Sequence, residues 1–187
     1  MRWHRLWGST NLATVDELLR HFERQVALPW RDVAVEYRVW ILHYDKALER
    51  RVRGRLSEFE AIARRHAHGW RVLDLAPLWA HWIAAHELFV GLVDLPDELP
   101  GVLPDFADHV AVTVRHELST CGPSDLLTVA GAGSLLGLCR VSNLIEKVAP
   151  QIPGRLLLLF PGRHEGGVYR LLDARDGWNY RATPIPA

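Results

Sequence analysis

Cysteine and lysine are scarce in this chain, and long apolar runs are missing. Cys121 and Cys139 are the only cysteines among 187 residues, which is too few, at this spacing, for a disulfide framework or a zinc knuckle. No stretch approaches the roughly 20 apolar residues that a transmembrane helix needs. The first residues also lack the apolar run and cleavage site of a secretory signal. We therefore expect a cytoplasmic protein without a membrane interaction.

The chain has no net charge, because 22 basic residues balance 22 acidic ones. Non-specific nucleic-acid binding depends on an excess of basic charge that neutralises phosphates, so we expect no direct binding to nucleic acid. Lys46 and Lys147 are the only lysines. The remaining cations are arginines, which suit fixed ion pairs and protein interfaces better than lysines do.

Apolar runs that alternate with amphipathic segments predict the fold class. Residues 39–42, 70–75, 126–130 and 156–160 are typical of buried strands. Thr14 and Glu17 have capping-box spacing at the start of the first helix. The expected helices are 15–26, 46–67, 77–89, 104–118 and 134–148, the expected loop is 92–104, and the expected closing strands are 168–172 and 178–183.

This order of elements predicts an α/β fold with a layered, mostly parallel central sheet. Helices would cover both faces of the sheet, and one or two antiparallel strands would lie at the C-terminal edge. We expect a single domain over residues 1–187, in which residues 1–13 form a loose N-terminal arm.

In such folds, ligands bind outside the carboxyl ends of the parallel strands. Tyr44, Asp45 and Asp74 are predicted to form a polar cluster there, and Asp45 is also well placed to cap the next helix. Arg140 is the lone charge of an apolar predicted helix. A buried arginine needs an anionic partner, which could be Asp45 or Asp74 in an internal ion pair, or a bound anion.

The glycines of the turn after the third predicted strand superficially suggest a dinucleotide-binding loop. Their spacing, Gly-x-Gly-x-x-x-Gly from residue 131, lacks the acidic residue expected about 20 positions later, and no Walker A lysine exists. We therefore expect no standard nucleotide loop and no cofactor. One alternative stays open: a degenerate nucleotide- or phosphate-binding site, whose residues would be Gly131, Gly133, Ser134, Arg140 and Arg163.

The predicted helix at 46–67 carries many arginines off its apolar stripe. Arg50, Arg51 and Arg53 belong either to a solvated face with i,i+4 ion pairs or to a partner-binding face. Trp79 and Trp82 could add the large aromatic contacts that interfaces favour.

The sequence predicts neither a metal site nor an active site. His81 and His86 are five residues apart, so they diverge around a helix instead of sharing one face. No nucleophile elbow is present, and neither cysteine has an evident base beside it. The chain therefore does not indicate an enzyme.

The end of the chain resembles the BrxB family of BREX phage-defence systems. The resemblance is carried there by residues 156–162 (Leu-Leu-Leu-Leu-Phe-Pro-Gly), 169–172 (Tyr-Arg-Leu-Leu) and 179–182 (Asn-Tyr-Arg-Ala). Upstream, it continues through 28–30, 38–40, 44–45, 58–60, 68–70, 74–75, 129–133 and the helix residues Arg140, Ser142 and Leu144. Departures from the family pattern are Lys46 and Gly137.

The resemblance implies a component of a multi-gene antiviral system for which no catalytic residues can be carried over. It implies a PglZ-type protein, with an alkaline-phosphatase-like domain, as partner, together with other BREX components. The leading hypothesis is therefore a non-catalytic interaction or assembly module, and the alternative is the degenerate nucleotide- or phosphate-binding domain in the same system.

Overall fold

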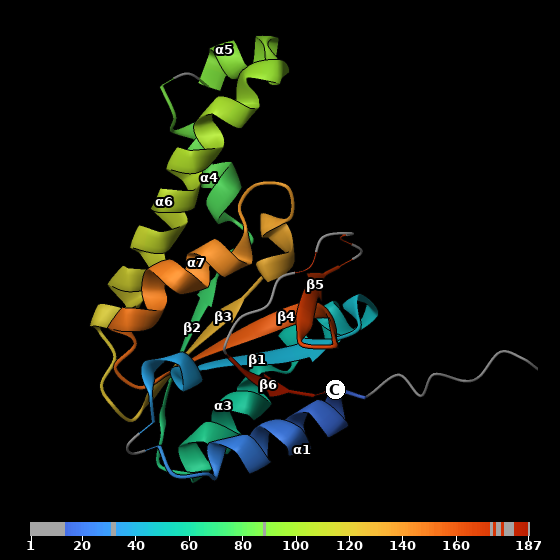
Figure 1. The fold of residues 1–187 in the computed structure, drawn as a ribbon, viewed down its shortest axis with the longest axis vertical. Helices are drawn as coiled ribbons and strands as arrows, with labels where there is room; N and C mark the ends of the chain where they lie inside the picture. The colour runs from blue at the N-terminus through green and yellow to red at the C-terminus, as the bar shows by residue number, and fades with distance from the viewer. Residues whose placement is uncertain are drawn as a thin grey trace, which may run out of the picture.

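A mostly parallel sheet forms the centre of the molecule (Figure 1). The structure is a computed structural model that describes residues 14–30, 33–87, 89–172, 174, 177 and 182–186. The strand order is β2-β3-β4-β1-β6, and β5 pairs with β4. The strands are β1 (Val39–Tyr44), β2 (Gly69–Asp74), β3 (Asp125–Ala130), β4 (Arg155–Glu165), β5 (Val168–Leu171) and β6 (Thr183–Ile185).

Helices cover both faces of this sheet, which confirms the predicted fold class. Because successive strand residues point to opposite faces, Ile41 packs with one helical layer and Leu42 with the other. The layer against Leu42 contains α1 (Val15–Val26), α2 (Glu49–Gly54) and α3 (Leu56–Arg65). The layer against Ile41 contains α4 (Leu78–Ala84), α6 (Leu99–Ser119) and α7 (Val141–Val148).

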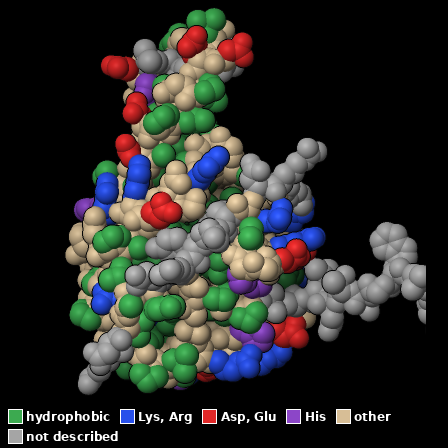
Figure 2. Space-filling view, in the orientation of Figure 1, with side chains coloured by type: hydrophobic (Ala, Val, Ile, Leu, Met, Phe, Trp, Pro, Cys, Tyr) green, Lys and Arg blue, Asp and Glu red, His purple; other side chains and the backbone are tan. Residues whose placement is uncertain are grey.

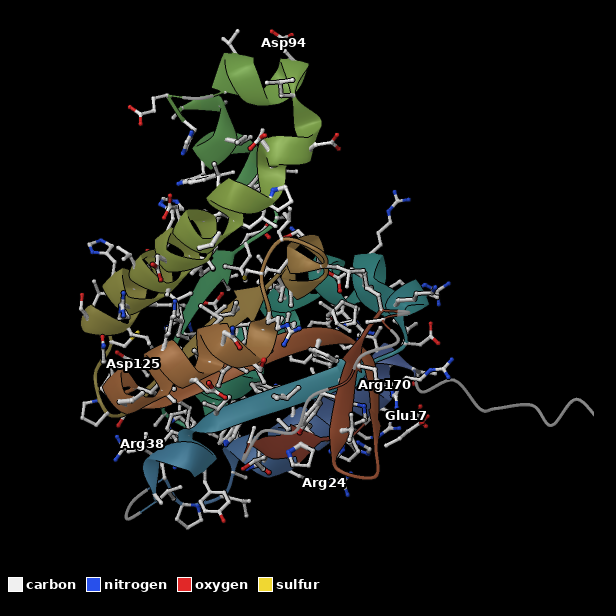
Figure 3. The ribbon with its side chains drawn as sticks, turned by 45° about the horizontal axis from the view of Figure 1, so that its top comes forward. Glu17, Arg24, Arg38, Asp94, Asp125 and Arg170 are labelled. Carbon is white, nitrogen blue, oxygen red and sulfur yellow. The ribbon has the colours of Figure 1, made fainter. Side chains whose placement is uncertain are left out.

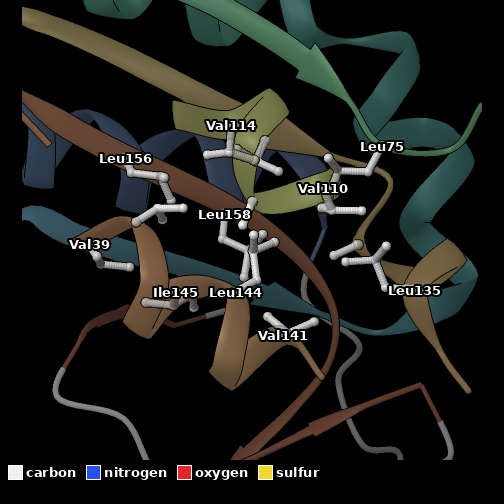
Figure 4. Close-up of a cluster of buried hydrophobic side chains, with 14 of the residues drawn as sticks. Val39, Leu75, Val110, Val114, Leu135, Val141, Leu144, Ile145, Leu156 and Leu158 are labelled. Carbon is white, nitrogen blue, oxygen red and sulfur yellow. The ribbon is translucent and has the colours of Figure 1, made fainter. Parts of the chain in front are cut away.

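Figure 4 shows the core between the sheet and the second layer. Val110 and Val114 of α6 and Leu144 of α7 pack with Leu156 and Leu158 of β4. Burial of each such side chain stabilises the fold by roughly 1.5–3 kcal/mol relative to leaving it exposed. The uninterrupted apolar run of β4 is therefore explained by helices on both of its faces.

Several predicted elements differ from the structure. The helix expected at 46–67 is divided into a 3₁₀ turn, η2 (Lys46–Leu48), and the helices α2 and α3, which are separated by Arg55. The loop expected at 92–104 is wrong, because every residue of it except Leu95 is helical: it contains the end of a short helix that finishes at Asp94, a 3₁₀ turn (Pro96–Glu98) and the start of α6, which begins at Leu99 and continues through Pro104. Between α4 and α6 lies a further short helix, α5 (Phe89–Asp94).

The helix expected at 134–148 is also wrong in its first half. A 3₁₀ turn, η4 (Ala132–Leu135), follows β3, and α7 starts only at Val141. Gly137 has φ +79°, which an α-helix cannot accommodate. The chain therefore leaves the turn in an irregular segment before it becomes helical.

The two last strands join the sheet in opposite senses. β5 folds back antiparallel onto the outer part of β4 through Gly166 and Gly167, as predicted. β6 instead runs parallel to β1, and most of the strand expected at 178–183 lies outside the described residues, as do residues 1–13 and 179–181. Among the described helices, none is both long and apolar enough to span a bilayer.

Candidate functional site

The carboxyl ends of β1 and β2 carry a chain of ion pairs and hydrogen bonds. The Tyr44 hydroxyl donates to the Glu49 carboxylate at 2.6 Å. Arg53 of α2 lies 4.0 Å from Glu49 and makes a close ion pair with Asp74. Tyr44 and Asp74, which the sequence places at neighbouring strand ends, are thus linked through two residues of the following helix.

Burial raises the pKa of Tyr44 far above its usual value, and the negative charge of Glu49 adds to the effect. The phenol is therefore a permanent hydrogen-bond donor and not a base. Asp45, the third predicted member of the cluster, has a separate task. Its Oδ1 accepts from the backbone N–H of Ala47 at 2.8 Å, so it caps η2 as the sequence predicts.

The Asp74 carboxylate also packs against the glycine turn after β3. Its Oδ1 accepts from the Ala76 N–H at 3.0 Å. A Cβ placed on Gly131, which has φ +74°, would lie only 2.6 Å from the same oxygen. The space beside the turn is consequently occupied by a fixed negative charge, which disfavours a phosphate at this place.

The five residues of the hypothetical anion site do not form one cradle. The Ser134 hydroxyl donates to the Gly131 carbonyl at 2.8 Å and so closes the turn on itself. Gly133 faces Pro161 and Leu172 at van der Waals distance. Because α7 begins ten residues after Gly131, its amides do not follow the turn.

The predicted burial of Arg140 is wrong. Arg140 is exposed, is the N-terminal cap residue of α7, and makes no ion pair with Asp45, Asp74 or any other described residue. It lines an open groove of about 1200 Å³ between α6 and α7. Arg163 lies elsewhere, exposed on β4 and directly across from Arg170 of β5, so two cations face each other there.

Among the described residues, the buried arginine is Arg155, at the amino end of β4. It is 4% exposed, and its guanidinium lies 5.1 Å from the Trp30 ring centre and 5.7 Å from that of Trp40. It donates to the carbonyls of Trp30 and Gly154 at 2.9 and 3.0 Å. Burial lowers its pKa, and the neighbouring charge of Arg38 contributes. The sequence signal that could have identified this buried arginine is its position directly before the uninterrupted apolar run of β4.

Two histidines that were not predicted as site residues lie near the carboxyl ends of β1 and β4. The rings of His43 and His164 are 5.6 Å apart, and His164 stacks on Tyr169 at 4.2 Å. Burial lowers the pKa of His43 to about 4, with a further contribution from the charge of His164. Both histidines follow apolar runs that predict parallel strands, so their place at the same edge of the sheet was the available signal.

The arginines of α2, of α3 and of the position between them, Arg55, divide into paired and unpaired side chains. Arg53, Arg55, Arg64 and Arg65 make ion pairs with carboxylates of α1, α2, α3 or β2. Arg50 and Arg51 are exposed on α2 and form no ion pair with any residue that the structure describes. Of the three arginines predicted for a partner-binding face, two therefore keep a free charge.

Trp79 and Trp82 are half-buried and hold α4 against α6. Their rings lie 4.9 and 5.4 Å from that of Phe106. His81 and His86 border a shallow hollow beside Trp82. Within the described part of the chain, no group of three His, Cys, Asp or Glu side chains could hold a metal ion.

The comparisons with known proteins add no relative. A scan against protein-family models, a search of curated proteins and a search of solved structures each returned no match. The resemblance to the BrxB family therefore depends on the residues quoted for it, of which 179–181 lie outside the described residues.

Proposed function

We propose that the protein is a non-catalytic interaction module of a BREX-type phage-defence system. Its partner is a PglZ-type protein with an alkaline-phosphatase-like domain, and other BREX components are further partners. The ordered series of motifs that resembles the BrxB family supports the choice of system. The distribution of charged side chains in the structure supports a role in protein interaction.

One observation carries the proposal. At the strand ends, where an α/β fold ordinarily binds its ligand, Asp74 is paired with Arg53 and closes off the Gly131 turn. Arg50 and Arg51, one turn from that network, instead point their charges into solvent. The polar groups at the strand ends therefore bind one another, whereas the charges of Arg50 and Arg51 remain available on the surface. This arrangement favours recognition of another macromolecule over a reaction on a small molecule.

Co-expression with the neighbouring operon products tests the proposal. The tagged protein should retain the PglZ-type protein on an affinity column. The double variant Arg50→Glu/Arg51→Glu should weaken retention at least tenfold, because two contacts would become repulsive. Arg24→Glu/Arg64→Glu is the matched control, since it makes the same charge change at exposed positions of α1 and α3.

Both variants should stay folded. Arg50, Arg51 and Arg24 have no ion pair with a described residue, and the exposed Arg64–Glu60 pair is worth only about 0.3–0.5 kcal/mol. Failure of the wild-type protein to retain the PglZ-type protein, with all operon products present, would refute the proposed function. Equal weakening by the test and control pairs would show that α2 is not a specific contact.

A further inference from the structure

A helical projection extends from one side of the molecule. Figure 1 shows α5 and the first turns of α6 rising beyond the sheet and its covering helices, and Figure 3 places Asp94 at the tip. α6 packs on the sheet only through its later part, which contains the buried Val110, Val114 and Leu118. We define the projection as Glu87 and residues 89–105.

The tip of the projection exposes large apolar side chains. Val90 is 74% exposed, Leu95 62% and Phe89 39%. They lie within seven residues of one another on either side of the end of α5. An apolar group of this kind on a protruding element is typical of a protein contact that is buried only in a complex.

The charge of the projection has a single sign. Residues 87–105 contain no lysine, arginine or histidine, and their acidic residues are Glu87, Asp94, Asp97, Glu98 and Asp105. On the face shown in Figure 2, the projection carries mostly green and red side chains, a purple histidine lies at its edge, and the blue ones begin at its base. Two projections would repel each other, so this surface does not suit a tip-to-tip dimer.

The same carboxylates decide the class of partner. They would be repelled by phosphates of nucleic acid and by the anionic lipids of a cytoplasmic membrane surface. An apolar tip surrounded by carboxylates is complementary to an apolar cleft bordered by arginine or lysine. Such a cleft belongs to a protein surface.

We infer that the projection is a docking element that inserts Val90 and Leu95 into a basic-rimmed apolar cleft of the PglZ-type partner. The inference depends on the proposed function and adds a second contact to that of Arg50 and Arg51. The acidic rim sets orientation and speeds association, and the apolar tip supplies the tightly packed centre.

Binding of full-length variants to the purified PglZ-type protein tests this inference. Val90→Asp/Leu95→Asp should weaken binding about tenfold or more, as loss of central interface contacts does. Asp94→Lys/Asp97→Lys/Glu98→Lys should weaken it as well and should reduce the loss of affinity that wild type shows at high salt. Val112→Asp is the control, because Val112 is 56% exposed on the part of α6 that packs against the body.

The outcomes separate the two proposals. Loss of binding in both tip variants, with the control unchanged and all variants melting cooperatively, supports docking through the projection. Wild-type binding with unaffected tip variants overturns this inference and leaves the proposed function in place. Absence of wild-type binding overturns the proposed function, and the docking inference falls with it.

Discussion

Gly131 is the residue on which the geometry of the strand ends depends most directly. It combines a left-handed φ of +74° with the close approach of Asp74 Oδ1. Gly131→Ala should therefore cost the left-handed strain of about 1–2 kcal/mol and, in addition, displace the Asp74 carboxylate from its pair with Arg53. Urea unfolding followed by circular dichroism measures the loss.

Gly137 provides the matched control for this substitution. Its φ is +79°, but a Cβ there would meet nothing within 4 Å. Gly137→Ala should consequently lose only the strain of about 1–2 kcal/mol. If the two alanine variants were equally destabilised, Asp74 would not be packed against the turn in the way described here.

His43 makes a prediction about pH. Its pKa is about 4 in the folded protein, against an ordinary value of 6.5, so the unfolded chain takes up the proton first as the pH falls. Its contribution to the free energy of unfolding is complete above pH 6.5 and is lost between pH 6.5 and about 4. His43→Gln should flatten the fall in stability over this range.

NMR titration of the His43 ring provides the direct measurement. The imidazole signals should stay in the neutral form down to about pH 5 and shift only near pH 4. A titration midpoint near 6.5 would mean that burial between β1 and β4 does not affect this ring.

For single residues, the sequence predicted which kinds of environment the fold contains more accurately than which residues occupy them. It anticipated a buried arginine, but chose Arg140 instead of Arg155, because it took the apolar segment before α7 to be helix. It anticipated Tyr44 and Asp74 at adjoining strand ends, but not Glu49 and Arg53 between them. Those links depend on how α2 packs, which no local pattern encodes.

Among the elements, α1 has the most completely specified start. Thr14 Oγ1 accepts from the Glu17 N–H at 3.3 Å, and the Thr14 N–H donates to the Glu17 carboxylate at 2.6 Å. Thr14→Ala should destabilise the protein by about 1 kcal/mol, whereas Thr14→Ser keeps the oxygen and should cause no loss, because serine is at least as good an N-cap as threonine. Equal losses in denaturant unfolding would contradict the capping box.

Strands were easier to predict than helix boundaries, for a physical reason. An apolar run that is buried on both faces has few alternative structures, so β1, β3 and β4 lie where the sequence indicates. Prolines misled the prediction of 92–104, because Pro100 lies in the first turn of α6, where its missing N–H costs nothing. In the helix predicted at 134–148, Gly137 excludes helical structure from the first half through a backbone angle that its neighbours do not reveal.

At the scale of the whole molecule, the closed strand ends make a prediction about small ligands. A thermal-shift screen with nucleotides and inorganic phosphate should be flat, because Asp74 occupies the space beside Gly131. A ligand at 100 times its dissociation constant would stabilise the protein by about 2.7 kcal/mol, which such a screen detects. A clear shift with any nucleotide would revive the nucleotide-binding alternative.

Acidic and basic surfaces lie on different parts of the molecule, as the proposed interaction with a partner protein requires. The projection is acidic and apolar, the outer surface of α2 is basic, and the strand ends between them are internally neutralised. In Figure 3, Asp94 lies at one end of the molecule and Arg24 at the opposite end. A partner that contacts both the projection and α2 would have to span the carboxyl edge of the sheet.

Titration of the purified protein into a purified PglZ-type protein from the same operon, followed by calorimetry, tests the central claim most directly. We predict saturable binding with a dissociation constant of about 1 μM or tighter, equivalent to about −8 kcal/mol. We also predict weaker binding at high salt, since charged surfaces of both signs take part. No saturable binding with both proteins at about 50 μM, far above that constant, would contradict the central claim.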